Sequence, residues 1–181
     1  MQAAPQRRLR PLLVQAGVSL AATAIILGLA LRAEGLSGAL RAAAAGSGPH
    51  LPRLELLAVA SPAIQLHVAG VLAALTVGAV LLSGVKGTRV HRTLGWGWVA
   101  AMATVAVSSL FIRQINAGGF SLLHLFSGWT LVALPIGVVA ARRHKVRMHG
   151  RMMTGLFTGG LIVAGVVAFM PGRLMWRMFF G

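Results

Sequence analysis

The sequence predicts an all-α integral membrane protein with five transmembrane helices, the last four forming an antiparallel bundle. Hydrophobic residues make up 57% of the chain, and charged residues only 10%, with just two acidic side chains. A soluble domain would carry about 25% charged residues. Several apolar runs reach or approach the roughly 20 residues that cross a bilayer. We therefore expect an N-terminal anchor and outer loop over 1–61 and a membrane bundle over 62–181.

Five apolar segments define the predicted spans. The first follows the basic run "RRLR" and is longer than the roughly 7–15-residue apolar core of a cleaved signal peptide, so it reads as an uncleaved signal anchor. The long connection after it contains "AAAAGSGPHLP", a turn-rich composition, and forms the predicted outer loop. The expected spans are 11–31, 62–83, 94–112, 120–140 and 152–170.

The basic residues predict the orientation. If the N-terminus lies inside, eleven of the 17 arginines and lysines fall in inner segments and six in outer ones. The positive-inside rule then favours an N-in, C-out topology. Trp96 and Trp98 fit an inner aromatic belt, and Trp176 fits an outer one.

Composition also excludes several classes of function. The net charge of +15 is spread over short clusters between apolar runs, unlike the continuous basic stripe of a nucleic-acid-binding protein. The absence of cysteine excludes thiolate catalysis and cysteine-ligated metal sites. The spans lack carboxylates, which argues against a carboxylate-based transporter.

Four histidines occupy mirrored positions along the last four spans. His67 and His124 lie near the predicted outer ends of two spans, and His91 and His149 lie at the inner starts of the returning spans. In an antiparallel four-helix bundle with short loops, alternate helices are diagonal partners. A b-type haem iron needs one axial ligand on each face. The pattern therefore predicts up to two haem b groups, with iron ligated by His67 with His124 and by His91 with His149.

Glycines and arginines near these histidines extend the predicted site. Gly70, Gly95 and Gly128 each follow a histidine by three or four residues, so they share its helix face and leave room for a flat ring. Arg92 and Arg151 follow the inner histidines and could pair with haem propionates. The positive-inside bias and contact with lipid phosphates explain the same arginines more simply.

Other interpretations of the same residues remain open. A histidine at a membrane edge often serves only as an interfacial polar group, which makes a haem-free scaffold or accessory protein the main alternative and a small-molecule permease the next. His50 and His144 are expected to be solvated. Gly155 and Gly159 stand at the GxxxG spacing, which serves helix packing within a bundle or in a homodimer.

Four segments resemble known families. "HRTLGW", "FSLLHLFSGW", "RMHGRMMTGL" and "MPGRLMWRMFFG" resemble a family of predicted bacterial membrane proteins of unknown function, domain 2306, over about 62–181. That resemblance implies a multi-pass protein of the bacterial inner (cytoplasmic) membrane.

The order of histidines is also similar to the cytochrome b-561 group, in which four histidines on successive helices ligate two haems. This resemblance implies electron transfer across the membrane, with His67, His91, His124 and His149 as ligands. We expect the electron donor to be a quinol or another reductant. The chain shows no ascorbate-site motif.

Overall fold

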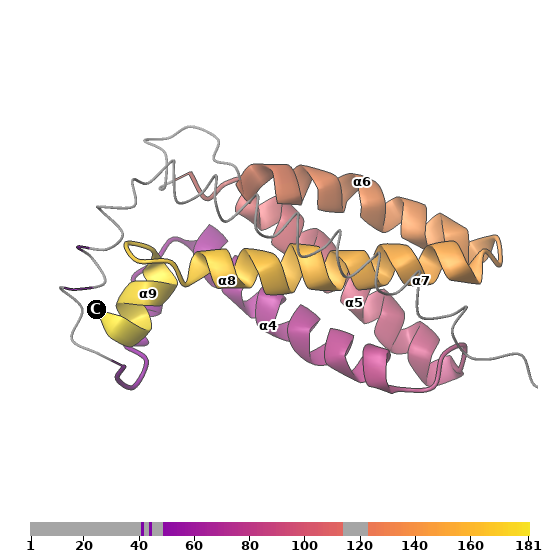
Figure 1. The fold of residues 1–181 in the computed structure, drawn as a ribbon, viewed down its shortest axis with the longest axis horizontal. Helices are drawn as coiled ribbons and strands as arrows, with labels where there is room; N and C mark the ends of the chain where they lie inside the picture. The colour runs from indigo at the N-terminus through magenta and orange to yellow at the C-terminus, as the bar shows by residue number, and fades with distance from the viewer. Residues whose placement is uncertain (1–40, 42–43, 45–48, 114–122) are drawn as a thin grey trace, which may run out of the picture.

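The computed structural model describes residues 41, 44, 49–113 and 123–181. Over these ranges the chain is helical and contains no strand, so the predicted all-α class is confirmed for them. The predicted first span at 11–31 and most of the predicted outer loop lie outside the described residues. Figure 1 shows long helical segments lying side by side, with a short helix across one end.

The first long helix, α4, covers Pro62–Ser83 and matches the predicted second span. It follows the one-turn helix α3, Glu55–Ala58. Proline suits the first turn of α4 because its fixed φ is helical and its missing N–H would have no intrahelical partner there. The helix ends at Gly84, whose N–H still donates to the carbonyl of Val80.

A short loop turns the chain back into α5, Arg89–Ser109. Gly87 has a φ of +82°, a left-handed conformation that glycine adopts without steric cost. Thr88 then caps α5, because its hydroxyl accepts the N–H of His91 at 3.1 Å. The helix consequently begins five residues before the predicted start at 94 and takes His91 into its first turn.

The second pair of helices is joined by a similarly tight loop. Helix α6 covers Leu123–Arg142 and runs through Pro135. His144, at φ +55°, reverses the chain before α7, Val146–Gly155. Helix α7 begins six residues before the predicted fifth span, because charged residues extend the helix beyond the apolar segment.

The last long helix changes its hydrogen-bond pattern in the middle. After α7 the chain forms a π-helix, η2, over Leu156–Val163, and returns to α-helix in α8, Ala164–Ala168. A π-helix is rare and occurs frequently at functional sites. The sequence LFTGGLIV gave no basis for predicting it.

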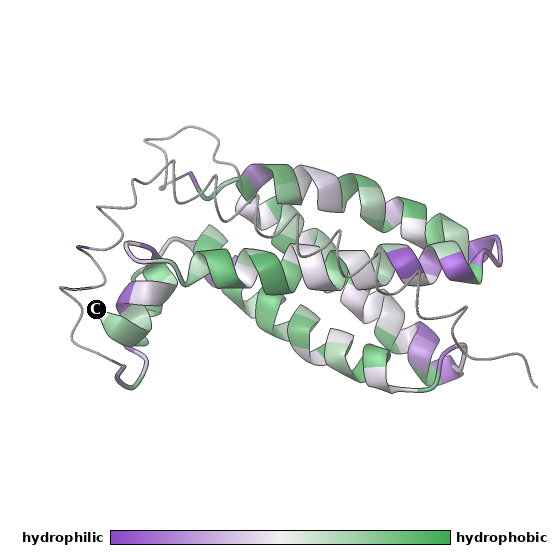
Figure 2. Ribbon diagram, in the orientation of Figure 1, coloured by the Kyte–Doolittle hydropathy of each residue, from purple (hydrophilic) through white to green (hydrophobic). Residues whose placement is uncertain are grey.

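The long helices pack around one core. Helix α5 contacts α4 and α6, α6 contacts α7 and η2, and η2 also contacts α4. Figure 2 shows apolar residues along most of the helix lengths, with polar ones concentrated near the α4–α5 and α6–α7 loops.

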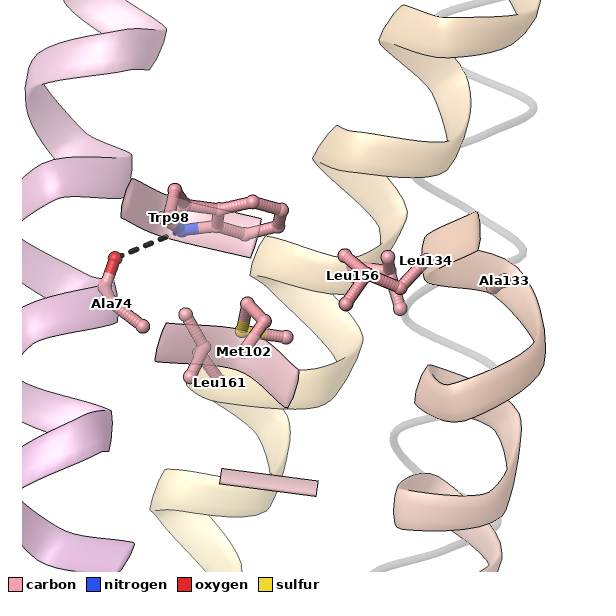
Figure 3. Close-up of a cluster of buried hydrophobic side chains, with 7 residues drawn as sticks. All are labelled: Ala74, Trp98, Met102, Ala133, Leu134, Leu156 and Leu161. Atoms are coloured by element: carbon pink, nitrogen blue, oxygen red, sulfur yellow. Dashed lines mark hydrogen bonds between the residues drawn. The ribbon is translucent and has the colours of Figure 1, made fainter. Parts of the chain in front are cut away.

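Seven buried residues form the main core cluster (Figure 3), namely Ala74, Trp98, Met102, Ala133, Leu134, Leu156 and Leu161. Trp98 was predicted in the inner aromatic belt, and that prediction is wrong. Its side chain is only 3% exposed, and its indole Nε1–H donates to the carbonyl of Ala74 at 3.0 Å. By contrast Trp96 is 54% exposed. An indole can enter the core where its N–H finds a carbonyl partner.

Three of the described helices are long and apolar enough to cross a membrane: Pro62–Ser83, Leu123–Arg142 and Val146–Ala168. Helix α5 has 21 residues, which is sufficient length, but arginine, glycine and tryptophan in its first half lower its hydropathy. The predicted third span, 94–112, is therefore not among the three, and its helix ends at Ser109.

The C-terminal helix α9, Leu174–Phe180, lies across one end of the molecule (Figure 1). The segment before α3 is bound to it by main-chain hydrogen bonds, His50 N–H to Phe179 O and Arg53 N–H to Met178 O, both 3.0 Å. These bonds hold the described part of the predicted outer loop at the end where α4 begins.

Candidate functional site

His67 is held against the neighbouring helix. It lies on α4, half-buried, and its Nδ1 is 3.0 Å from the carbonyl oxygen of Val105 on α5. A carbonyl can only accept, so the proton of a neutral ring is on Nδ1 and Nε2 keeps its lone pair. The hydroxyl of Ser108 lies 3.2 Å from the same nitrogen. His67 is thus fixed in one tautomer.

Hydroxyl groups connect the helices at this end. Ser108 is buried and donates to the carbonyl of Thr104 at 2.6 Å. Next to it, Ser109 on α5 forms a hydrogen bond with the buried hydroxyl of Ser127 on α6. His124 is half-buried on α6, three residues before Ser127. We call His67, His124, Ser108, Ser109 and Ser127 the His67 layer.

His149 is held in the same way at the other end. It is half-buried on α7, and its Nδ1 donates to the carbonyl of Gly137 on α6 at 3.0 Å. The absence of a side chain at Gly137 lets the helices approach closely, since an added Cβ would lie 2.0 Å from Met153 Cε and 3.2 Å from Met152 Cβ. We call His149, His91, Gly137, Met152 and Met153 the His149 layer.

His91 completes the His149 layer. It lies in the first turn of α5, half-buried, and His149 lies in the first turn of α7. Both helices begin at the end of the bundle where the α4–α5 and α6–α7 loops lie (Figure 1). His91 also lines a cavity of about 220 Å³ between α4 and α5, together with Val80, Leu81 and Leu94. The two predicted inner ligands therefore lie in one region of the fold.

An apolar layer separates the two histidine layers. Ala74, Trp98 and Leu156 of the core cluster each lie seven residues from a histidine on the same helix, His67, His91 and His149 respectively. At 1.5 Å per helical residue, seven residues correspond to about 10 Å. The described fold thus places polar imidazoles toward both ends of the bundle, with the buried apolar cluster of Figure 3 between them along the helices.

The three predicted site glycines have different surroundings. Gly70 is buried against α5, where an added Cβ would lie 3.0 Å from Val105 Cγ2, so its missing side chain serves helix packing in this structure. An added Cβ at Gly95 or at Gly128 would meet no described atom within 4 Å. Gly95 is half-buried and Gly128 is exposed. Their predicted role beside a haem stays a prediction.

The two predicted site arginines, Arg92 and Arg151, are both exposed. Exposure is compatible with either predicted partner, a propionate or a lipid phosphate. A third arginine, Arg142 at the end of α6, places its guanidinium carbon 5.5 Å from the ring centre of Trp96 on α5. This cation–π contact joins the two helices beside the His149 layer.

The remaining histidines lie apart from both layers. His144 is exposed in the α6–α7 loop, as expected. The ring nitrogens of His50 lie 2.8 Å from Leu51 O and 3.1 Å from Gly181 O, both main-chain oxygens. His50 therefore joins the segment before α3 to the C-terminal segment.

Several groups in the layers were missed by sequence reasoning. The carbonyls of Val105 and Gly137 carry no sequence signal, since every residue has a carbonyl. The serines at 108, 109 and 127 do carry one, because hydroxyls within otherwise apolar segments need partners. For Gly155 and Gly159 an added Cβ would meet no described atom within 4 Å, so the packing of the described helices does not depend on them. Both interpretations of the GxxxG spacing stay predictions.

Within the described ranges, no group of three or more metal-ligating side chains is assembled. A bis-histidine haem needs only two ligands, so the predicted haem sites do not depend on such a group.

The comparisons with known proteins agree with the membrane character of the fold. No curated protein and no solved structure matches the chain. Residues 64–178, which contain both histidine layers and the core cluster, match the family described as predicted membrane protein (DUF2306). The chain belongs to this family of predicted membrane proteins.

Proposed function

We propose that this protein is a membrane-embedded electron carrier of the b-type cytochrome kind, with up to two bis-histidine haem b groups. The observation that carries the proposal is the matched anchoring of His67 and His149, each donating its Nδ1–H to a main-chain carbonyl of a neighbouring helix. Metal-ligating histidines almost always make such a bond, because it orients the ring and raises the basicity of the other nitrogen.

The residues present suit this cofactor in three respects. The donor set is imidazole nitrogen, which ligates haem iron. The buried apolar cluster between the layers would keep water away from the region that electrons must cross. Exposed Arg92 and Arg151 would supply charge-assisted hydrogen bonds to propionates at the end that holds the His149 layer.

Each residue has a defined task in this proposal. His67 and His124 would ligate one iron, and His91 and His149 the other. The carbonyls of Val105 and Gly137 would hold two of the rings in the tautomer that presents Nε2. Haem iron, when bound, supplies a one-electron carrier. A quinol or another reductant is the proposed donor.

The membrane arrangement that we propose has five spans. The predicted first span precedes the three apolar helices found, and α5 joins them as the remaining span because it packs between α4 and α6. The basic α4–α5 and α6–α7 loops would face the cytoplasm in a bacterial inner membrane. A reporter fused after Arg177 should then be active only outside the cytoplasm, and one inserted at Lys145 only inside. The opposite pattern would overturn the N-in, C-out orientation.

A haem-free scaffold is the second candidate. The observation that favours it is the packing in the middle of the core. There Trp98, Met102 and Leu156 are buried in one cluster without a cofactor. Such a protein would use its histidines for helix packing alone.

A visible spectrum of the full-length protein, expressed with ample haem, distinguishes the two candidates. The cytochrome proposal expects a low-spin, six-coordinate spectrum and about two haems per chain, since two imidazoles leave no open position on the iron. Protein that is folded and free of any haem absorption would refute it and favour the scaffold.

A further inference from the structure

A groove along α6 and the start of α7 is lined by none of the residues of the two histidine layers. It has a volume of about 270 Å³, and its apolar lining consists of Pro135, Ile136, Val139, Ala140 and Met148. Two cations, Arg143 and Lys145, complete its lining in the α6–α7 loop. The groove therefore combines an apolar wall with a positively charged end.

The dimensions of this groove follow from the helix. Pro135 and Arg143 are eight residues apart, which corresponds to about 12 Å along the axis. The apolar part belongs to Leu123–Arg142, one of the helices suited to crossing a membrane, and the cations follow directly after it. Ile136 and Val139 are 37% and 45% exposed, so their side chains are accessible from outside the bundle.

We propose that this groove binds one anionic phospholipid. An acyl chain would lie against Ile136, Val139 and Met148, and the headgroup phosphate would bind Arg143 and Lys145. Charge complementarity selects the occupant, because the described lining contains two cations and no acidic side chain. Basic pockets between membrane helices recognise anionic headgroups in this way. Phosphatidylcholine would also fill the apolar part, but the ammonium of its headgroup offsets the phosphate charge and would be repelled by the two cations.

The proposal can be tested on the purified full-length protein by native mass spectrometry. Dioleoyl phosphatidylglycerol is compared with dioleoyl phosphatidylcholine, which has the same chains and no net charge. One phosphatidylglycerol should bind each chain more tightly than phosphatidylcholine does. Changing both Arg143→Gln and Lys145→Gln should weaken that binding roughly 25-fold, since each cation near a membrane surface contributes about fivefold.

A matched control removes the same charge elsewhere at this end of the bundle. Lys86→Gln with Arg89→Gln should change phosphatidylglycerol binding by less than about twofold. An equal loss in both double variants would show that diffuse charge, and not the groove, attracts the lipid. Equal binding of the two lipids to the native chain would also overturn the proposal.

A second pair of variants tests the apolar wall and distinguishes a lipid from a free phosphate. Val139→Trp, or Ile136→Trp if the first variant does not fold, should fill the groove and weaken phosphatidylglycerol binding. Soluble glycerol phosphate should not compete with the lipid at equal concentration. Efficient competition, or lipid binding unaffected by both tryptophans, would show a simple anion site. None of these measurements depends on haem, so their outcome is independent of the proposed electron transfer.

Discussion

The two ends of the bundle fix a histidine by the same bond but surround it differently. In the His67 layer the acceptor is the main-chain carbonyl of Val105. The side chain of Val105 is β-branched and has one strongly preferred rotamer in a helix. In the His149 layer the acceptor is Gly137, which is packed against Met152 and Met153. Methionine is flexible and fills irregular spaces. We therefore expect the packing around the first histidine to be stiffer than the packing around the second.

The buried hydroxyls reinforce this difference. Those of the described core belong to Ser108, Ser127 and Thr130, and all three lie in the half of the bundle nearer His67. Interhelical hydrogen bonds fix relative helix positions, whereas contacts between methionine and glycine fix only the distance. The same hydrogen bond from a histidine to a main-chain carbonyl is thus supported by interhelical hydroxyl bonds at one end and by close helix packing at the other. We expect the two ends to differ in how much a substitution destabilises them.

The largest expected effect is the loss of a whole haem, and the histidine that is changed decides which of the two haems is lost. If the proposed function holds, His67→Ala and His124→Ala should each remove the same haem, and the double change should remove little more, because partners in one site act as a unit. His91→Ala and His149→Ala should remove the other haem and leave the first largely intact. Haem content and the low-spin spectrum of each variant provide the measurement.

The control for this series is the histidine pair outside the layers. His50→Ala and His144→Ala should leave the haem content unchanged. Losses that crossed the layers, for example one haem removed by both His67→Ala and His91→Ala, would refute the pairing while leaving haem binding itself intact.

A smaller effect should reveal the difference in stiffness. Gly70→Ala places a Cβ 3.0 Å from the stiff Val105, whereas Gly137→Ala displaces mainly the flexible end of Met153. We expect Gly70→Ala to lower the free energy of unfolding by about 1 kcal/mol more than Gly137→Ala, at the lower end of typical overpacking costs. Unfolding by SDS in mixed micelles measures both.

Gly128→Ala is the matched control, because an added Cβ there meets no described atom within 4 Å. The free energy of unfolding of the Gly128→Ala variant should not be lower than that of the native protein. If Gly137→Ala were the more damaging change, the His149 layer would be the stiffer one and the comparison would be reversed.

The smallest expected effect concerns the hydroxyl pair between α5 and α6. Ser109→Ala or Ser127→Ala should each lower the free energy of unfolding by roughly 0.6 kcal/mol, the average for such bonds in a membrane protein. The double variant should lose about as much as either single one, because both remove the same bond. Ser83→Ala, whose exposed hydroxyl bonds within its own helix, is the control. Fully additive losses would show that this pair does not connect the helices.

Hydropathy located the apolar segments, but it did not predict where each helix that contains such a segment begins. The span at 62–83 coincides with α4, since Pro62 begins the helix where the apolar run begins and Gly84 ends it where that run ends. Helices α5 and α7 begin five and six residues before the predicted spans, because a threonine cap and charged helix formers extend them toward the loops. Hydropathy marks which residues suit a bilayer, whereas capping and main-chain bonds decide where a helix begins.

By itself, the sequence determined that residues 49–113 and 123–181 are helical and apolar and that histidines lie near the ends of the four predicted spans they contain. Residue type and spacing are sufficient to predict helices and the positions of histidines along them, since both depend only on the local sequence. Only the tertiary structure decided that His67 binds the carbonyl of Val105, that His149 binds that of Gly137, and that Trp98 is in the core. Every residue carries a carbonyl, so the sequence cannot distinguish the one that helix packing brings within 3.0 Å of an imidazole.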